Sequence, residues 1–130
     1  MLSALFTGIQ SKFSGDSDLS SALTGGLYLV EAPADYDTYP YGTYFIVSAV
    51  PQETFSSTIE QVMIQFNIFH NSATDTTVND VYDKLTALYD NCTLTVSGYN
   101  FISMLRQNTY HLREDDIWQV SVEYMIRMVL

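Results

Sequence analysis

The sequence is poor in cysteine and in positive charge, and each scarcity excludes a class of protein. Cys92 is the only cysteine among 130 residues, so the chain forms no disulfide of its own and no cysteine cluster for zinc. Five Lys and Arg stand against fifteen Asp and Glu, which gives a net charge of −10 at pH 7. Each phosphate contact of a nucleic-acid binder needs a cation. We therefore do not expect the surface of one copy to bind nucleic acid tightly.

Long apolar runs and strongly biased segments are also missing. No stretch approaches the roughly 20 apolar residues of a membrane span, and the first thirteen residues lack the basic start of a signal peptide. We therefore expect no membrane segment and synthesis in a cytoplasm. Three Pro, six Gly and no heptad run exclude collagen-like and coiled-coil classes. With 47% hydrophobic and 15% charged residues, the sequence predicts one folded domain over residues 1–130.

Apolar spacing predicts two main helices. Apolar side chains recur every three or four residues over residues 2–13, and a further short turn is expected over 19–23, before Gly25 and Gly26. The same spacing predicts a helix that begins near Val78, with Thr77 and Asp80 as a capping box, and ends near residue 90. Each helix has a single apolar face, so we expect both to lie on a sheet.

Alternation of apolar and polar residues predicts the strands, and hence the fold class. The predicted strands are 27–32, 44–50, 59–70, 92–96, 101–111 and 117–129. In the third, Val62, Ile64, Phe66 and Ile68 share one face, while Met63 and Phe69 lie on the other. The sequence predicts an α+β fold: a single antiparallel or mixed sheet of about five to six strands, with two main helices packed on one face.

No group of residues forms a recognisable catalytic, metal or cofactor site. The chain lacks a phosphate-binding loop and a G-x-S-x-G turn. His70 and His111 are its only histidines, and the acidic run 114–116 that follows His111 is more typical of a solvated turn. Cys92 fits a small buried hydrophobe. We therefore expect no catalytic residue, no metal ligand and no cofactor.

A tyrosine-rich loop and the second face of the long strands are the candidate binding surfaces. Tyrosine is enriched at protein interfaces, because it buries a large rigid area and still satisfies a hydroxyl. The loop residues around Pro40 are flanked by aspartates, which favours exposure, and methionine and phenylalanine on the outer strand face favour a covered surface. The predicted interface residues are Tyr36, Asp37, Tyr39, Pro40, Tyr41, Met63, Phe69 and Met125.

The order of these segments resembles a known family. An amphipathic helix (LSALFTGIQSKF) leads to a double glycine and LYLVEA, and Pro40-Tyr41 then enters YFIVSAV. VMIQFNIFH precedes a helix of the type VNDVYDKLTALYD, and the chain ends in WQVSVEYMIRMV. This arrangement is similar to the tail-completion, or tail-terminator, proteins of long-tailed bacteriophages and of phage-derived particles such as gene transfer agents. Leu27 departs from the pattern, because such proteins often carry a basic residue after the double glycine.

The resemblance implies a structural virion protein without enzymatic activity. Such proteins form a hexameric ring of identical copies at the head-proximal end of the tail tube, where they stop tube growth and join the tail to the head. The implied partners are the tail tube protein and a head-completion or neck protein. DNA passes through the lumen without specific binding, and an acidic surface would repel its phosphates. The implied location is the tail or neck of a virion assembled in the host bacterial cytoplasm.

Two other functions remain open from the residues alone. A small cytoplasmic ligand-binding or regulatory module, acting as a dimer, would use the tyrosines and phenylalanines to line a pocket between helices and sheet. An acid-dependent hydrolase would need a nucleophile beside a base, which the sequence does not indicate. Symmetry separates the first two hypotheses, since a pocket protein has no need of a six-fold ring.

Overall fold

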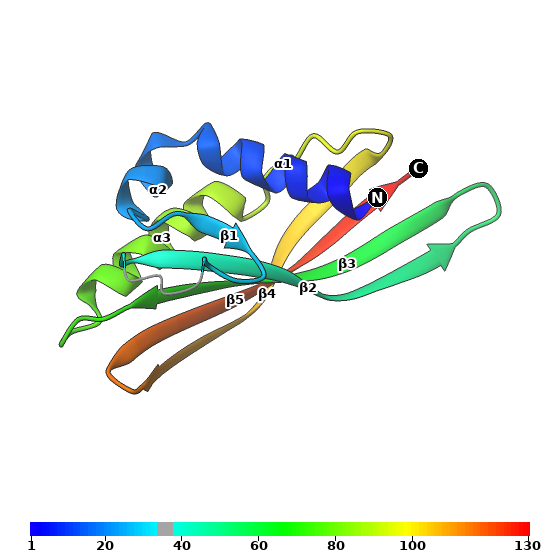
Figure 1. The fold of residues 1–130 in the computed structure, drawn as a ribbon. Coiled ribbons are helices and arrows are strands. Elements are labelled where there is room, and N and C mark those ends of the chain that lie inside the picture. The colour runs from blue at the N-terminus through cyan, green and yellow to red at the C-terminus, as the bar shows by residue number, and fades with distance from the viewer. Residues whose placement is uncertain (34–37) are drawn as a thin grey trace.

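The chain folds as an α+β domain in which helices cover one face of a single sheet (Figure 1). The computed structural model describes residues 1–33 and 38–130. The elements, in chain order, are α1 (Leu2–Ser14), α2 (Ser17–Ala22), β1 (Leu27–Leu29), β2 (Tyr41–Glu53), β3 (Thr58–His70), α3 (Thr76–Tyr89), β4 (Asn100–Glu114) and β5 (Ile117–Val129). This architecture confirms the predicted fold class.

The sheet is mixed, with strand order β1-β2-β3-β5-β4. β1 pairs with β2 in parallel, and every other pairing is antiparallel. The hairpins β2–β3 and β4–β5 are long, and their turns extend beyond the helices toward opposite ends of the sheet (Figure 1). The helices therefore cover only part of the sheet, and the rest of both hairpins is available for contacts with other molecules.

The core lies between the helices and the inner face of the sheet. Val62, Ile64, Phe66 and Ile68 of β3 are fully buried, as their alternation predicts. Aromatic rings fill the centre: the Phe66 ring stacks on Tyr89 of α3 at 4.8 Å between centroids and meets Tyr124 of β5 edge-on at 5.9 Å. The Tyr89 hydroxyl donates to the carbonyl of Ile9 in α1 (3.0 Å), which joins both main helices to this cluster.

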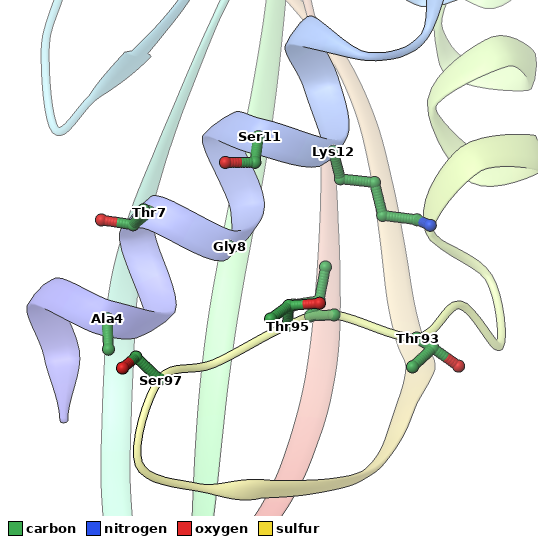
Figure 2. A pocket seen from close by; sticks show the side chains of 9 residues that line it. Ala4, Thr7, Gly8, Ser11, Lys12, Thr93, Thr95 and Ser97 are labelled. Carbon is green, nitrogen blue, oxygen red and sulfur yellow. The ribbon is translucent and has the colours of Figure 1, made fainter.

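The predicted strand 92–96 is wrong. Leu94 and Val96 are buried and Thr95 is exposed, so the burial alternates as in a strand, but the segment runs along α1 and joins no sheet (Figure 2). Gly8 allows this packing, because a Cβ at Gly8 would lie 2.7 Å from the carbonyl oxygen of Thr95. Packing against a helix therefore accounts for the alternation that predicted a strand.

Several predicted boundaries also differ. β1 ends at Leu29 rather than at residue 32, because Val30 adopts a left-handed backbone conformation (φ 68°). β2 runs on through Pro51, which a strand tolerates where one of its sides has no neighbour. The capping box is absent: α3 begins at Thr76, before the predicted cap, and Asp80 instead pairs with Lys84 at 3.0 Å.

Candidate assembly surfaces

The described part of the tyrosine-rich loop forms an aromatic cluster with β3. Tyr36 and Asp37 lie outside the described residues. The Tyr39 and Tyr41 rings lie 5.4 Å apart, and Tyr41 stacks on Phe69 at 5.0 Å. All three side chains are half-buried. The structure therefore brings three of the predicted interface residues together on the face of the sheet that no helix covers.

Pro40 has a different environment from its neighbours. It is buried, and its carbonyl accepts a hydrogen bond from the Gly25 amide (2.8 Å). A Cβ at Gly25 would lie 2.3 Å from the carbonyl oxygen of Thr38, so the double glycine lets the loop pack closely against the end of the α2 region. Pro40 and Gly25 thus anchor the base of the loop that presents Tyr39.

A pocket of about 280 Å³ adjoins the aromatic cluster. Tyr39, Tyr41 and Phe69 line one side, and Leu112 and Asp115 from the β4–β5 hairpin belong to the other. The acidic turn of that hairpin is exposed, and Arg113 pairs with Asp116 at 3.7 Å. The pocket thus has an aromatic wall and an acidic rim, an arrangement suited to a polypeptide partner with an apolar and a basic group.

Met63 and Met125 form a second apolar patch on the same face. They are direct partners across β3 and β5, both are half-buried, and Met125 also lies opposite the exposed Leu105 of β4. Phe69 lies six positions after Met63 along β3, which corresponds to about 20 Å along a strand. The predicted interface residues therefore divide between two patches rather than forming one.

An uncharged polar ladder lies between these two patches. The Asn67 Oδ1 atom accepts hydrogen bonds from Ser121 Oγ (2.6 Å) and from Gln65 Nε2 (2.8 Å), and the Asn67 amide donates to Thr43 Oγ1 (3.4 Å). Asn67, Thr43 and Ser121 are buried. The buried polar groups of this ladder are hydrogen-bonded to one another, so they need no covering element to satisfy them.

Within residues 1–33 and 38–130, both long sides of the sheet have strand edges without a neighbouring strand. β4 is a terminal strand with exposed Ile102, Tyr110 and Leu112, and its outer edge bonds the Asn91 amide at the Met104 carbonyl (3.1 Å). On the other side, β1 covers β2 only as far as Tyr44. Long, exposed edges with apolar side chains are templates for pairing with another chain. The two edges differ in sequence and in position, so they are suited to contacts between unlike surfaces of neighbouring copies.

The tip of the β2–β3 hairpin is the feature that the sequence-based prediction missed. Phe55 is fully exposed there, and Val47 and Val50 are about half exposed along the same arm. The sequence does carry one signal for this tip, because Phe55 is the single aromatic residue in the polar stretch 52–58. Apolar periodicity does not detect an isolated residue of this kind.

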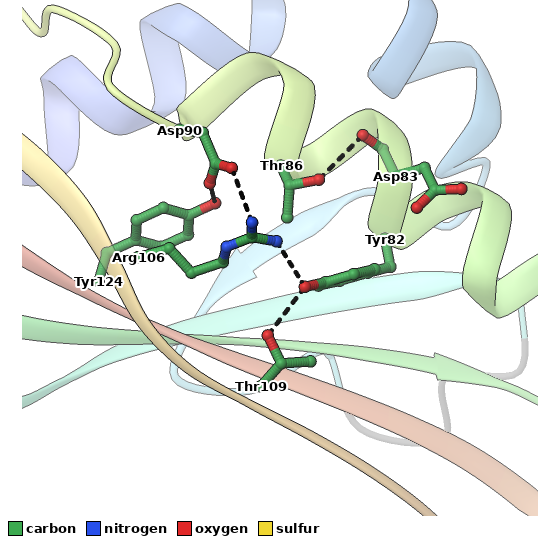
Figure 3. A network of polar contacts seen from close by, with 7 residues as sticks. All are labelled: Tyr82, Asp83, Thr86, Asp90, Arg106, Thr109 and Tyr124. Atoms are coloured by element: carbon green, nitrogen blue, oxygen red, sulfur yellow. Dashed lines mark hydrogen bonds and ion pairs between the residues drawn. The ribbon is translucent and has the colours of Figure 1, made fainter.

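A polar network fixes the edge strand β4 against α3 (Figure 3). Arg106 of β4 pairs with Asp90 (3.3 Å) and donates to the Tyr82 hydroxyl (2.7 Å), which in turn bonds Thr109 (2.8 Å). Asp90 also accepts from the buried Tyr124 hydroxyl (2.6 Å). Burial, and then this bond, raise the pKa of Tyr124, so the phenol stays protonated and acts as a donor. The network is suited to holding β4 in place.

The two histidines lie in different environments. His111 Nε2 lies 3.4 Å from Asp75 Oδ2, with both side chains largely exposed. Burial lowers the pKa of His70, which favours its neutral form. Across those residues, no group of three His, Cys, Asp or Glu side chains could hold a metal ion. Within the same ranges, no helix has the length and apolar character needed to cross a membrane.

Comparisons with known proteins relate the chain to solved structures. No family model matches the sequence, and no curated protein is a significant match. One structural match is a chain of the "Virion of native gene transfer agent (GTA) particle", with a TM-score of 0.88 and 11% identity over 99% of this chain and 97% of that one. A second solved structure, whose name states no function, has a TM-score of 0.57 and 15% identity over 97% and 95%. The chain therefore has the fold of a component of a gene transfer agent virion.

Proposed function

We propose that this chain is a structural protein of a phage or phage-derived particle, and that it forms a hexameric ring at the head-proximal end of the tail tube. The observation that carries the proposal is the agreement of its whole fold with a chain of a gene transfer agent virion. The tail-terminator role rests on the resemblance of the sequence segments to tail-terminator proteins. In that role the ring ends tube growth and offers its other side to a head-completion or neck protein.

The shape of the chain supports a ring. A ring needs two different surfaces on each copy that contact each other head-to-tail, with a rotation between copies that closes. The edge of β4 and the outer edge of β2 beyond Tyr44 are two different surfaces available for such contacts, on opposite sides of the sheet. The aromatic cluster of Tyr39, Tyr41 and Phe69 is then a candidate contact with the tube or the neck.

The charge of the chain suits a passage for DNA. Three of its five cations, Lys84, Arg106 and Arg113, form ion pairs with aspartates. Along β3 and β5, the face without helices has Glu123 and Arg127 as its charged residues, and its centre is the neutral ladder around Asn67. A ring with a net charge of −10 per copy has few cations that could hold phosphates.

The alternative of a ligand-binding module has less support. That hypothesis needs a pocket between the helices and the sheet, where the structure instead places fully buried side chains such as Phe66, Tyr89 and Leu85. A pocket of about 490 Å³ does lie where α1 meets the sheet, with Leu29 and Tyr44 in its lining, but it is open to the surface and does not enter the core. Two further surface pockets lie beside α1 and beside the aromatic cluster.

Tail tubes grown from purified tube protein test the terminator role directly. Added during growth, this protein is expected to shorten the tubes and to be visible by electron microscopy as a ring at one end of each tube. Tubes of unchanged length, without rings at either end, would contradict the proposal.

The double variant Tyr36→Ala with Tyr39→Ala tests the aromatic loop in the same assay. We expect it to cap fewer tubes, while its free energy of unfolding changes by less than about 1 kcal/mol, because Tyr39 lies outside the buried core. Tyr39→Phe keeps the ring and is the matched control. Equal losses of capping and stability would show that these tyrosines belong to the core, and normal capping would remove the loop from the interface.

A further inference from the structure

We propose that the tip of the β2–β3 hairpin of one copy, led by Phe55, inserts into the pocket between α1 and segment 93–97 of the next copy. The contact is one of the head-to-tail contacts of the ring, and it rests on the proposed function. Each copy carries both the hairpin tip and the pocket, on different elements. Each copy can therefore insert its tip into one neighbour and bind the tip of the other.

The tip is built to present its aromatic residue. Residues 54–57 form a turn closed by bonds between Thr54 and Ser57: the Thr54 amide donates to the Ser57 carbonyl (2.8 Å), and the Ser57 amide donates to Thr54 Oγ1 (3.1 Å). The Thr54 hydroxyl also donates to the Ser57 carbonyl (2.9 Å). These bonds order the turn that exposes Phe55 fully. An ordered projection loses little conformational entropy on binding, so it is suited to insertion.

The receiving pocket has the size and lining for such a tip. It measures about 450 Å³ and lies between α1 and the 93–97 segment (Figure 2). Its lining includes the apolar Ala4 and Leu94, and Gly8, where α1 and the segment touch. The other lining residues besides Lys12 carry hydroxyls: Thr7, Ser11, Thr93, Thr95 and Ser97. The volume admits one aromatic side chain together with part of the turn that carries it.

The 93–97 segment also offers backbone groups to an incoming chain. Within residues 1–33 and 38–130, the amides of Thr93, Leu94 and Thr95 donate to no other group. Thr93 and Thr95 are exposed residues, and Leu94 between them is buried. Backbone amides without partners are strong donors, and an extended arm that lies along them can satisfy them.

Charge complementarity supports a second copy of this chain as the partner. Lys12 lines one end of the pocket and makes no ion pair in the part of the chain that the structure describes. The hairpin arm carries Glu53 beside the turn and Glu60 on the facing strand, and residues 47–60 contain no Lys or Arg. The hairpin turn extends beyond the helices (Figure 1), so this arm is presented to a neighbour.

Site-specific cross-linking in the assembled ring tests the contact. Both test proteins carry Cys92→Ser, which removes the native thiol. One also carries Ser56→Cys on the tip, and the other carries Thr93→Cys at the pocket. Ser56 and Thr93 are both exposed. A short bismaleimide is expected to join the two proteins when they are mixed in the ring, and neither protein alone should cross-link. A protein with both cysteines should give a ladder up to six copies. Asp83→Cys, exposed on α3, replaces Thr93→Cys as the control.

Three variants test the chemistry of the same contact. We expect Phe55→Ala and Lys12→Glu each to raise the dissociation constant of the ring at least about tenfold. Adding Glu53→Lys to Lys12→Glu reverses the charge on both sides and should recover most of the loss.

The outcomes separate this contact from the proposed function. A ring that forms without the 56–93 cross-link, or with it no stronger than the Asp83→Cys control, overturns the contact and leaves the ring in place. Failure to form a ring, both at high concentration and on tail tubes, overturns the proposed function and the contact with it.

Discussion

Replacing Phe66 with alanine lowers the free energy of unfolding by about 3–5 kcal/mol. Phe66 is fully buried at the centre of the sheet, and its ring contacts Tyr44 (5.8 Å), Tyr89 (4.8 Å) and Tyr124 (5.9 Å). Truncation removes the buried ring and leaves a cavity among three rigid aromatic neighbours from β2, α3 and β5, which have little freedom to fill it. The loss is therefore expected near the upper part of this range.

Urea denaturation of the two proteins side by side measures this loss. Phe55→Ala is the matched control at a protein concentration too low for a ring to form, because it makes the same chemical change at a position that is fully exposed in the single copy. It should alter the free energy of unfolding of that copy by less than about 0.5 kcal/mol. A change below about 1 kcal/mol for Phe66→Ala would mean that the inner face of β3 is assigned to the wrong side of the sheet.

Raising the pH above 10 is expected to unfold the protein steeply. Burial raises the pKa of Tyr89, and burial together with the bond to Asp90 raises the pKa of Tyr124. The unfolded chain releases these two protons near pH 10, while the folded chain keeps them. Stability is therefore unaffected below about pH 9 and falls above pH 10, by up to about 2.7 kcal/mol per pH unit for the two groups.

Denaturant titrations at pH 8, 10, 11 and 12 measure this dependence. The variant Tyr89→Phe with Tyr124→Phe starts from a lower stability, because it lacks the bonds to Ile9 and Asp90, but its stability should fall much less between pH 10 and 12. A wild-type stability that stays constant to pH 12, or an equal fall in the variant, would contradict the assignment of these two phenols to the core.

The central part of the fold could be predicted from the sequence because one face of the sheet is buried along its whole middle. Residues 62–68 and 118–128 alternate in hydrophobicity, and the structure places both in long neighbouring strands. The helix over residues 2–13 was predicted almost to the residue, since its apolar stripe faces the core. Where burial follows a simple period, the pattern and the structure agree.

The wrong predictions lie where burial does not follow a simple period along a strand or helix. Segment 92–96 packs against α1 at Gly8 and buries Leu94 and Val96, so its burial alternates without a strand. No local pattern distinguishes this packing from that of a strand. The boundary errors at Val30 and Thr76 depend on single backbone conformations and on a cap without a side-chain bond.

The candidate surfaces were predicted only in part. Residue type indicated Tyr39, Tyr41 and Phe69, and their stacking depends on the pairing of Tyr41 with Phe69 across β2 and β3. Which residues extend beyond the helices depends on the relative lengths of strands and helices. The exposure of Phe55 follows from those lengths, so apolar periodicity in the sequence does not predict it.

Native mass spectrometry across a concentration series tests the central claim, a six-fold ring, most directly. Six copies of 14.7 kDa total about 88 kDa, and we predict this species at high concentration and on addition of tail tube ends. A dimer that persists at every concentration, with no larger species when tube protein is present, would contradict the ring and favour the ligand-binding module.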